Sequence, residues 1–311
     1  MRERAAGAEN APVSHRRALA LAAALIAVLA PSAAAKPKPK PKPPTACNGA
    51  AVLCGRTFDQ VVLPGTHNSM SSATSHFFTP NQQVGIPAQL KLGIRGFLID
   101  TWDVDGEVWL CHLVCRDNMG QIPLAPVLKQ IASFLKAHPG EVLMFVNEDH
   151  TTPAEFVAAI EKSPLKRYLY RGATGPWPTL GQMVAKHQQV VITAESDVTG
   201  AAPWYHPAYT GIVQETPYSW PDETVLTDPA KQPDSCVPNR GGTTGSLFLM
   251  NHWSPPLGAN PEAGARVNAR DVIVSRAMTC AQVRGRLPTL IAVDMVKSGD
   301  VVGAVRQLNG L

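Results

Sequence analysis

The chain has 311 residues, 17% of them charged, and a formal net charge of +4. The basic excess does not indicate a nucleic-acid partner, because it lies near the N-terminus: residues 1–35 hold four Arg and two Glu, and four Lys follow in 36–42. The rest of the chain carries about −2 and lacks the positive surface that binds a polyanion. Residues 47–311 are long enough for one large domain with a sizeable core.

Residues 1–35 have the pattern of a secretory signal peptide. Arg16 and Arg17 precede thirteen apolar residues, and small residues at 32–35 offer a cleavage site. This apolar run is too short for a stable membrane span, and an ordinary export signal is favoured over a twin-arginine one. The Lys/Pro-rich linker 36–46 is predicted to be an extended spacer that holds the domain away from the membrane or wall. We therefore expect a secreted protein, extracellular or associated with the cell wall.

Six cysteines in an exported chain predict disulfides. Pairing by proximity in the sequence gives three bridges: Cys47–Cys54, Cys111–Cys115 and Cys236–Cys280. The rival interpretation is a zinc site, because His112 lies between two clustered cysteines. Export and the lack of CxxC spacing at Cys47 and Cys54 favour the disulfides.

Eight apolar runs have strand character: 58–63, 95–101, 107–112, 141–148, 189–195, 210–214, 246–252 and 289–296. Helical patterns are predicted over 124–135, after a capping box at Thr152–Glu155, over 265–283 and over 299–308. This alternation predicts a parallel sheet closed into a distorted (β/α)₈ TIM-type barrel, with a doubly wound open sheet as the alternative. Residues 103–106 are too few for a crossover helix, so the strands on either side are antiparallel or the barrel is distorted there. Residues 218–244 form a long loop that is expected to overhang one end.

Polar side chains end several of these runs. The carboxyl ends of barrel strands meet at one mouth, where the first four runs deliver His67 with Asn68, then Asp100, His112 and Glu148. Each alone has a structural explanation, such as a turn residue or a buried salt-bridge partner. Together, five groups suited to proton transfer or oxygen ligation are hard to attribute to packing, where unpaired polar groups are costly. Two histidines are suited to accept and donate protons near neutral pH.

Three segments carry a resemblance to a known family: VVLPGTHNSM, QLKLGIRGFLIDTWDVDGEVWLCH and EVLMFVNED. They resemble the X-domain of phosphatidylinositol-specific phospholipase C, and most closely its secreted, cysteine-containing members. Weaker matches extend the resemblance over residues 47–309. It implies that 47–311 is a catalytic domain that cleaves the phosphodiester between an inositol and a diacylglycerol, with a phospholipid at a membrane surface as its partner. We expect no nucleic acid and no obligate protein partner.

By the same resemblance, His67 would be the general base that takes the proton of the inositol 2-hydroxyl. His112 would be the general acid that protonates the departing glycerol oxygen. The first product would be a cyclic inositol phosphate, because the adjacent hydroxyl attacks phosphorus. Asp294 would orient His67; an internal salt bridge or a helix cap is the equal alternative.

The resemblance also implies a cation beside the phosphate. Some bacterial members place an arginine two residues after the aspartate that matches Asp100, and this chain has Trp102 at that position. Calcium-dependent members use an oxygen cluster, which predicts Asn68, Asp100 and Glu148 as Ca²⁺ ligands. Those members have a further carboxylate two residues before the aspartate. This chain has Leu98 at that position, so the calcium site is incomplete.

Two alternatives stay open at this stage. One is a phosphodiesterase for another lipid head group, such as a sphingophospholipid or a glycosylated inositol lipid. The other is an exported binding module weakened in catalysis by the missing arginine and by Leu98. The intact pair of His67 and His112 counts against the second.

Overall fold

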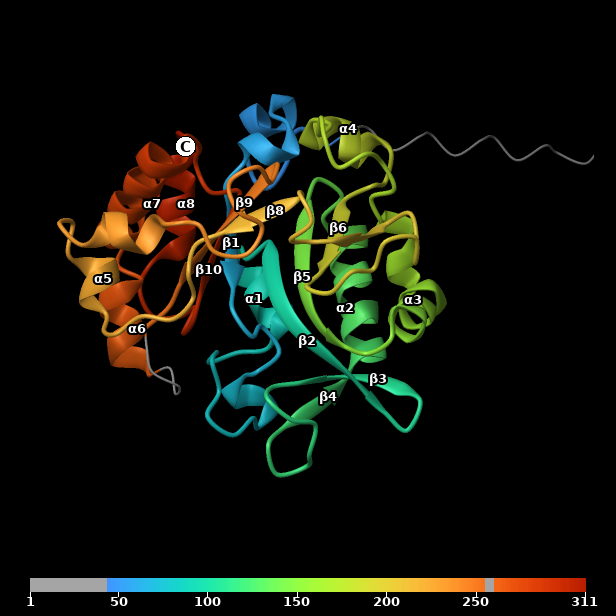
Figure 1. Ribbon diagram of the computed structural model, residues 1–311. Helices are drawn as coiled ribbons and strands as arrows, with labels where there is room; N and C mark the ends of the chain where they lie inside the picture. Colours follow the sequence, from blue (N-terminus) through green and yellow to red (C-terminus); the bar gives the residue numbers. More distant parts are fainter. Residues whose placement is uncertain (1–43, 255–259) are drawn as a thin grey trace, which may run out of the picture. The chain divides into compact units, whose positions relative to one another are not determined.

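A sheet of eight parallel strands curls around the centre of the molecule (Figure 1). The computed structural model describes residues 44–254 and 260–311. Across the sheet the order is β7 (Tyr205–Pro207), β6 (Val190–Ala194), β5 (Leu143–His150), β2 (Gly96–Val104), β1 (Leu63–Thr66), β10 (Leu290–Val293), β9 (Leu247–His252) and β8 (Val213–Glu215). Within the described residues no strand pairing joins β7 to β8, so the barrel is open along one seam. The predicted distorted (β/α)₈ barrel is confirmed, and the doubly wound alternative is wrong.

An antiparallel hairpin leaves this sheet at β2. The far half of β2 pairs with β3 (Glu107–Cys111), which pairs in turn with β4 (Gln121–Pro123). The turn between β2 and β3 is closed by the Gly106 amide, which donates to Asp103 Oδ1 over 3.1 Å. The expectation of an antiparallel pair at 103–106 is therefore confirmed. It follows that β3 is not a barrel strand, and the eighth parallel strand is β7, which the sequence did not predict.

Helices surround the sheet: most cover its outside, and one, Leu180–Ala185, packs on the inner cluster at the amino end of the barrel. They are α1 (Ile86–Leu92), α2 (Leu124–Ala137), α3 (Pro153–Lys162), α4 (Leu180–Ala185), α5 (Thr224–Thr227), α6 (Pro261–Val267), α7 (Arg270–Arg284) and α8 (Val301–Leu308). The predicted capping box is present, with Thr152 Oγ1 accepting from the Glu155 amide. The helix predicted over 265–283 is two helices, α6 and α7. Among the described residues no helix has the length and hydropathy to cross a membrane.

Short 3₁₀ helices complete the chain: η1 (Ala51–Gly55), η2 (Phe58–Gln60), η3 (Ala73–Ser75), η4 (Pro164–Tyr168) and η5 (Gln232–Cys236). The first predicted strand, 58–63, is wrong in its limits, because Thr57 and Gln60 form a capping box that turns the chain into η2. β1 begins only at Leu63. Phe58 instead packs on Trp177, with ring centroids 5.2 Å apart, and helps to close the amino end of the barrel.

Side chains alternate along each strand between two cores, as a two-residue repeat requires. Phe97 and Phe145 point outward and pack beneath the helices. Leu98 and Val146 point into the barrel, where they join the inner cluster. Two residues further along these inward rows stand Asp100 and Glu148. The interior therefore has an apolar floor and a polar mouth at the carboxyl ends of the strands.

All six cysteines form the three predicted disulfides, so the zinc interpretation is wrong. Cys236–Cys280 ties the 218–244 loop to α7. Arg276 of α7, which is fully buried, strengthens this attachment by donating to Ser235 Oγ over 2.7 Å and to the Asn251 carbonyl over 2.6 Å. The loop is thereby held beside the end of β9, at the mouth of the barrel.

The predicted signal peptide, 1–35, and residues 36–43 of the predicted linker lie outside the described residues. Both stay predictions, as does the domain boundary at residue 47.

Candidate active site

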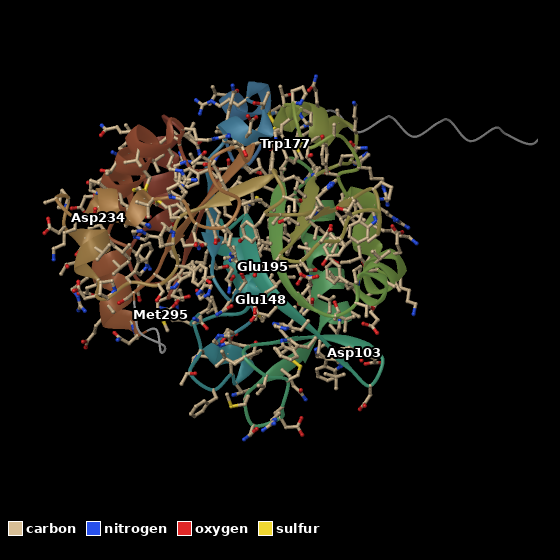
Figure 2. All side chains as sticks on the ribbon, viewed as in Figure 1. Asp103, Glu148, Trp177, Glu195, Asp234 and Met295 are labelled. Carbon is tan, nitrogen blue, oxygen red and sulfur yellow. A yellow bond between two sulfur atoms is a disulfide. The ribbon has the colours of Figure 1, made fainter. Side chains whose placement is uncertain are left out.

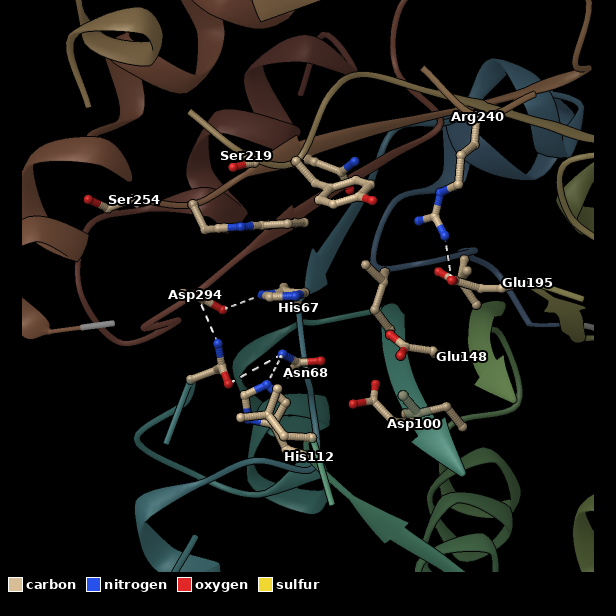
Figure 3. Close-up of a pocket in the computed structure, with 18 residues that line it drawn as sticks. His67, Asn68, Asp100, His112, Glu148, Glu195, Ser219, Arg240, Ser254 and Asp294 are labelled. Atoms are coloured by element: carbon tan, nitrogen blue, oxygen red, sulfur yellow. Dashed lines mark hydrogen bonds and ion pairs between the residues drawn. The ribbon is translucent and has the colours of Figure 1, made fainter. Parts of the chain in front are cut away.

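A cavity of about 540 Å³ opens at the carboxyl ends of the parallel strands (Figure 3). Every site residue predicted from the sequence lines it: His67, Asn68, Asp100, His112, Glu148 and Asp294. Figure 2 places Glu148 near the middle of the molecule, close to Glu195 at the end of the neighbouring strand. The polar strand ends thus converge, as expected from barrel topology.

Two contacts fix the ring of His67, which follows β1. Asp294, which follows β10, places Oδ1 3.0 Å from His67 Nδ1 and holds the other ring nitrogen toward the cavity. Trp253, beyond the end of β9, stacks on the same imidazole with ring centroids 3.8 Å apart and planes 7° from parallel. Asp294 is fixed in turn by Asn81, whose amide nitrogen donates to Oδ2 over 3.1 Å. The stacking against Trp253 therefore fixes the plane of the His67 imidazole. The hydrogen bond to Asp294 fixes the rotation of the ring within that plane.

His112 reaches the same cavity from the antiparallel hairpin rather than from a barrel strand. It lies inside the five-residue loop that the Cys111–Cys115 disulfide closes. Asn68 Nδ2 lies 3.0 Å from His112 Nε2, the distance at which an amide N–H donates to a neutral imidazole. Burial, followed by the charge of His67, lowers the pKa of His112, while Asp294 and Glu148 oppose that shift. Burial therefore favours the neutral form of His112.

Two carboxylates face each other across neighbouring strands, because Asp100 on β2 and Glu148 on β5 are register partners. Burial is the largest cause that raises the pKa of Asp100 well above its usual range, and the charges of Glu148 and Glu195 add to it. Within the described residues no hydrogen-bond donor or cation reaches the Asp100 carboxyl, although its residue is only 5% exposed. Glu148 Oε1 lies within hydrogen-bond distance of His150 Nε2, at 2.9 Å. Asp100 is therefore a buried acid without a partner.

A third cluster lies on the other side of the cavity. Arg240, from the 218–244 loop, forms ion pairs with Glu195 and with Glu215, whose Oε1 lies 2.6 Å from Nε. Its guanidinium also lies over the rings of Tyr209 and Tyr218, at 4.3 and 5.1 Å from their centroids. Burial is the main cause that raises the pKa of Glu195, and Arg240 opposes it. Of the described residues that line the cavity, Arg240 alone is a lysine or arginine.

The sequence did not identify Trp253 or Arg240 as functional residues. Trp253 carried a signal, since it stands two residues after Asn251 and so continues the inward-facing row of β9. Arg240 stands in one of the weaker matches to the family, but its place in the cavity depends on how a long loop folds back over the barrel. No group of three or more His, Cys, Asp or Glu side chains arranged to hold a metal occurs in 44–254 or 260–311.

Comparison with known proteins gives one consistent result. The family model PI-PLC X 1 matches residues 53–309. The chain is 28% identical to PI-PLC X domain-containing protein 1 of Arthroderma benhamiae, over 86% of this chain and 92% of that one. It is also 26% identical to an uncharacterized secreted protein of the same fungus, over 84% of this chain. The chain spans only 62% of the length of that second relative.

Solved structures show the same fold. The phosphatidylinositol-specific phospholipase C of Listeria monocytogenes superposes with a TM-score of 0.55 at 19% identity, over 82% of this chain and 94% of that one. A mutant of the Staphylococcus aureus enzyme gives 0.56 at 13% identity, over 81% and 93%. At these identities the likeness concerns the fold alone.

Proposed function

The chain belongs to the PI-PLC X family, and from this premise we propose that it is a phosphoric diester hydrolase of the phospholipase C type. Its substrate is phosphatidylinositol or a closely related glycerophospholipid at a membrane surface. The observation that carries the proposal is the presence of His67 and His112 in one cavity, although the two residues lie 45 positions apart in the sequence.

The two rings divide the proton transfers. His67, whose Nδ1–H is engaged by Asp294, keeps Nε2 free to take the proton of the inositol 2-hydroxyl. That oxygen attacks the adjacent phosphorus, and the bond from phosphorus to the glycerol oxygen breaks. His112 takes up a proton from solvent as the anionic phosphodiester binds beside it, and gives that proton to the glycerol oxygen. The products are diacylglycerol and a cyclic inositol phosphodiester.

The cavity's own charge argues for a bound cation. Four of its lining residues are acidic, while its one arginine is already paired with Glu195 and Glu215. An anionic phosphodiester would meet mostly negative charge. Calcium fits the donor chemistry at Asn68, Asp100 and Glu148, since these are hard oxygen ligands and Asp100 lacks any other partner. Figure 3 shows the Asn68 amide oxygen on the side of the two carboxylates, opposite the nitrogen that contacts His112.

Bound there, calcium would supply positive charge to the phosphate oxygens as the negative charge develops. Leu98 also lines the cavity, where it offers no oxygen. The protein set is therefore two carboxylates and one amide, which leaves the other positions to water and substrate oxygens.

The cluster around Arg240 is suited to the hydroxyls of the head group. Its carboxylates accept hydrogen bonds, and its guanidinium donates them. Glu195 at this position disfavours head groups that carry further phosphates, because two negative groups would meet at one end of the cavity. A neutral polyol such as unphosphorylated inositol fits better.

The proposed site of action is outside the cell. Three disulfides and a relative named as a secreted protein are consistent with an extracellular protein. The predicted signal at 1–35 and the spacer that follows add an export route and a tether, and both are part of the proposal.

The decisive experiment incubates the full chain with phosphatidylinositol vesicles and follows the phosphorus NMR spectrum. We expect the resonance of a five-membered cyclic phosphodiester to appear before any monoester. Direct appearance of an inositol monophosphate, with no cyclic species even early, would contradict the intramolecular attack. Absence of turnover on a panel of lipid phosphodiesters would favour the exported binding module instead.

The Cys111–Cys115 disulfide is expected to matter more for turnover than for stability. It closes a loop of five residues around His112, whereas Cys236–Cys280 spans a sequence separation of 44. On the chain-entropy account the two bridges contribute about 2 and about 4 kcal/mol to folding. We expect a variant with Ser at 111 and 115 to lose kcat with a small change in Tm. The matched variant at 236 and 280 should show the larger fall in Tm, and equal losses of kcat in both would refute the assignment.

A further inference from the structure

A continuous line of side-chain hydrogen bonds joins the two histidines of the cavity. Its first link is the contact of His67 Nδ1 with Asp294 Oδ1, at 3.0 Å. Asn81 Nδ2 donates to the other oxygen of Asp294 over 3.1 Å, and Asn81 Oδ1 accepts from Asn68 Nδ2 over 3.4 Å. The last link joins Asn68 Nδ2 to His112 Nε2, at 3.0 Å. The dashed lines in Figure 3 follow this line from ring to ring, and Asn81 stands at its middle.

The carboxylate of Asp294 determines the orientation of both amides. A carboxylate accepts hydrogen bonds and does not donate them, so Asn81 has to turn its amide nitrogen toward Asp294. The oxygen of Asn81 then faces Asn68, which has to donate with its own nitrogen. That nitrogen carries a second hydrogen, which is available to His112 Nε2. Each amide therefore has one orientation in which all of these contacts are satisfied.

The segment that carries Asn81 is fastened across the ends of β1 and β10. The Met295 amide donates to the Asn81 carbonyl over 2.8 Å. The next residue, Gln82, is fully buried, and its Nε2 donates to the His67 carbonyl over 2.7 Å and to the Val293 carbonyl over 2.9 Å. Asn81 itself is buried. Its position is therefore set by the same strand ends that present the general base and its carboxylate, and a fixed amide there can orient both of its neighbours.

We propose that Asn81 is a positioning residue that couples the general base to the general acid. Through Asp294 it keeps the His67 ring in the tautomer whose Nε2 is free to accept a proton. Through Asn68 it fixes the ring of His112. The inference rests on the proposed function, which assigns the proton transfers to these two rings. Loss of this one side chain should disturb both rings at once, whereas loss of an amide with a purely structural role would lower stability and leave both rings as they are.

The first test is Asn81→Leu, which removes both polar ends of the side chain and nearly keeps its volume. We expect kcat on phosphatidylinositol to fall about tenfold or more, because two buried groups lose a partner. KM should change by less than about twofold, since the contacts with substrate stay. The ring-nitrogen resonances of both His67 and His112 should move in the nitrogen NMR spectrum of the full chain.

The matched control is Asn309→Leu. Asn309 is buried and also uses both ends of its amide: Oδ1 accepts from the Val62 amide over 3.1 Å, and Nδ2 donates to the Val62 carbonyl over 2.9 Å. These contacts lie just before β1 begins, at the amino end of the barrel and outside the cavity lining. We expect this variant to lower Tm about as much as Asn81→Leu does, with kcat and both ring resonances unchanged.

An exchange of two side chains tests the proposal by recovery. In Asp294→Asn alone, Asn81 Nδ2 still needs an oxygen at position 294, so the new amide turns its nitrogen toward His67 Nδ1 and favours the wrong tautomer. Adding Asn81→Asp reverses this, because the new carboxylate accepts from the amide nitrogen at 294, whose oxygen then faces His67. The second oxygen of that carboxylate still accepts from Asn68. The double variant should therefore turn over at least about tenfold faster than Asp294→Asn.

The double variant keeps every hydrogen bond of the line, so this test does not depend on whether Asn81→Leu folds. The coupling is wrong if the double variant is no faster than Asp294→Asn, or if Asn81→Leu moves the resonances of only one ring. Because the nitrogen spectra need no substrate, they separate this proposal from the proposed function. A chain that cleaves no phosphodiester, but in which Asn81→Leu moves both rings, would refute the function and leave the coupling standing.

Discussion

Replacement of His67 or His112 by alanine is expected to lower kcat on phosphatidylinositol by about 10²- to 10⁴-fold, the usual contribution of a positioned acid or base. Both rings line one cavity, and each is held by a neighbour: His67 by Asp294 at 3.0 Å and His112 by Asn68 at 3.0 Å. Steady-state kinetics on vesicles would measure the loss. The exposed His138, at the end of α2, is the control, and His138→Ala should keep full activity.

A change of leaving group distinguishes the two roles. A nitrophenyl ester of inositol phosphate expels an oxygen that needs no proton, whereas its 2-hydroxyl still needs a base. On this substrate His112→Ala should recover to within about tenfold of the unaltered chain, and His67→Ala should stay as slow as before. Equal deficits of both variants on the nitrophenyl ester would show that the assignment of acid and base is wrong.

Removal of calcium is expected to have the second large effect. If Asn68, Asp100 and Glu148 hold the ion, a chelator should lower turnover by about 10²-fold or more, since the developing charge on the phosphate would face only acidic neighbours. Added calcium should restore the rate. Asp100→Asn should raise the calcium concentration needed for half-maximal turnover. Glu155→Gln, a change in the capping box of α3 and outside the cavity lining, should leave that concentration unchanged.

Calcium binding can be measured without turnover. A hundredfold excess of calcium over its Kd should raise the Tm of the unaltered chain by at least about 5 °C and should not raise that of Asp100→Asn. Leu98→Glu adds an oxygen ligand to the cavity wall and should tighten binding, so this variant tests the site by a gain. Full activity in chelator, with no calcium-dependent shift in Tm, would remove the metal from the mechanism.

The barrel and most of its strands could be predicted because buried parallel strands are apolar throughout. The run at 246–252 matches β9 to within one residue, and the run at 141–148 matches β5 with a shift of two residues at each end. β7 could not be found in this way, because three residues around His206 carry no apolar run. The error at 58–63 has a different cause, since the local cap at Thr57 overrides the propensity of an apolar segment.

Strand register explains part of the candidate site, but not all of it. Where a polar residue ends an inward-facing row, as at Asp100 and Glu148, its position is set by strand register and could be predicted. His112 was also identified, but by a different path, since an antiparallel hairpin brings it to the mouth. Arg240 depends on the packing of a long loop against α7 through Arg276, and no local pattern encodes such a contact.

The pairing of β1 with β10 joins the first and last strands of the described residues, and His67 and Asp294 lie just beyond this pair, 227 positions apart in the sequence. The contact between His67 and Asp294 therefore forms only after the segment that carries β10 has been made and has paired with β1. A chain that ends before β10 would still carry the three segments that most resemble the family, and yet its His67 ring would be unsupported. On the proposed function, an incompletely made chain would lack the support of its general base and would not cleave the lipids of the cell that makes it.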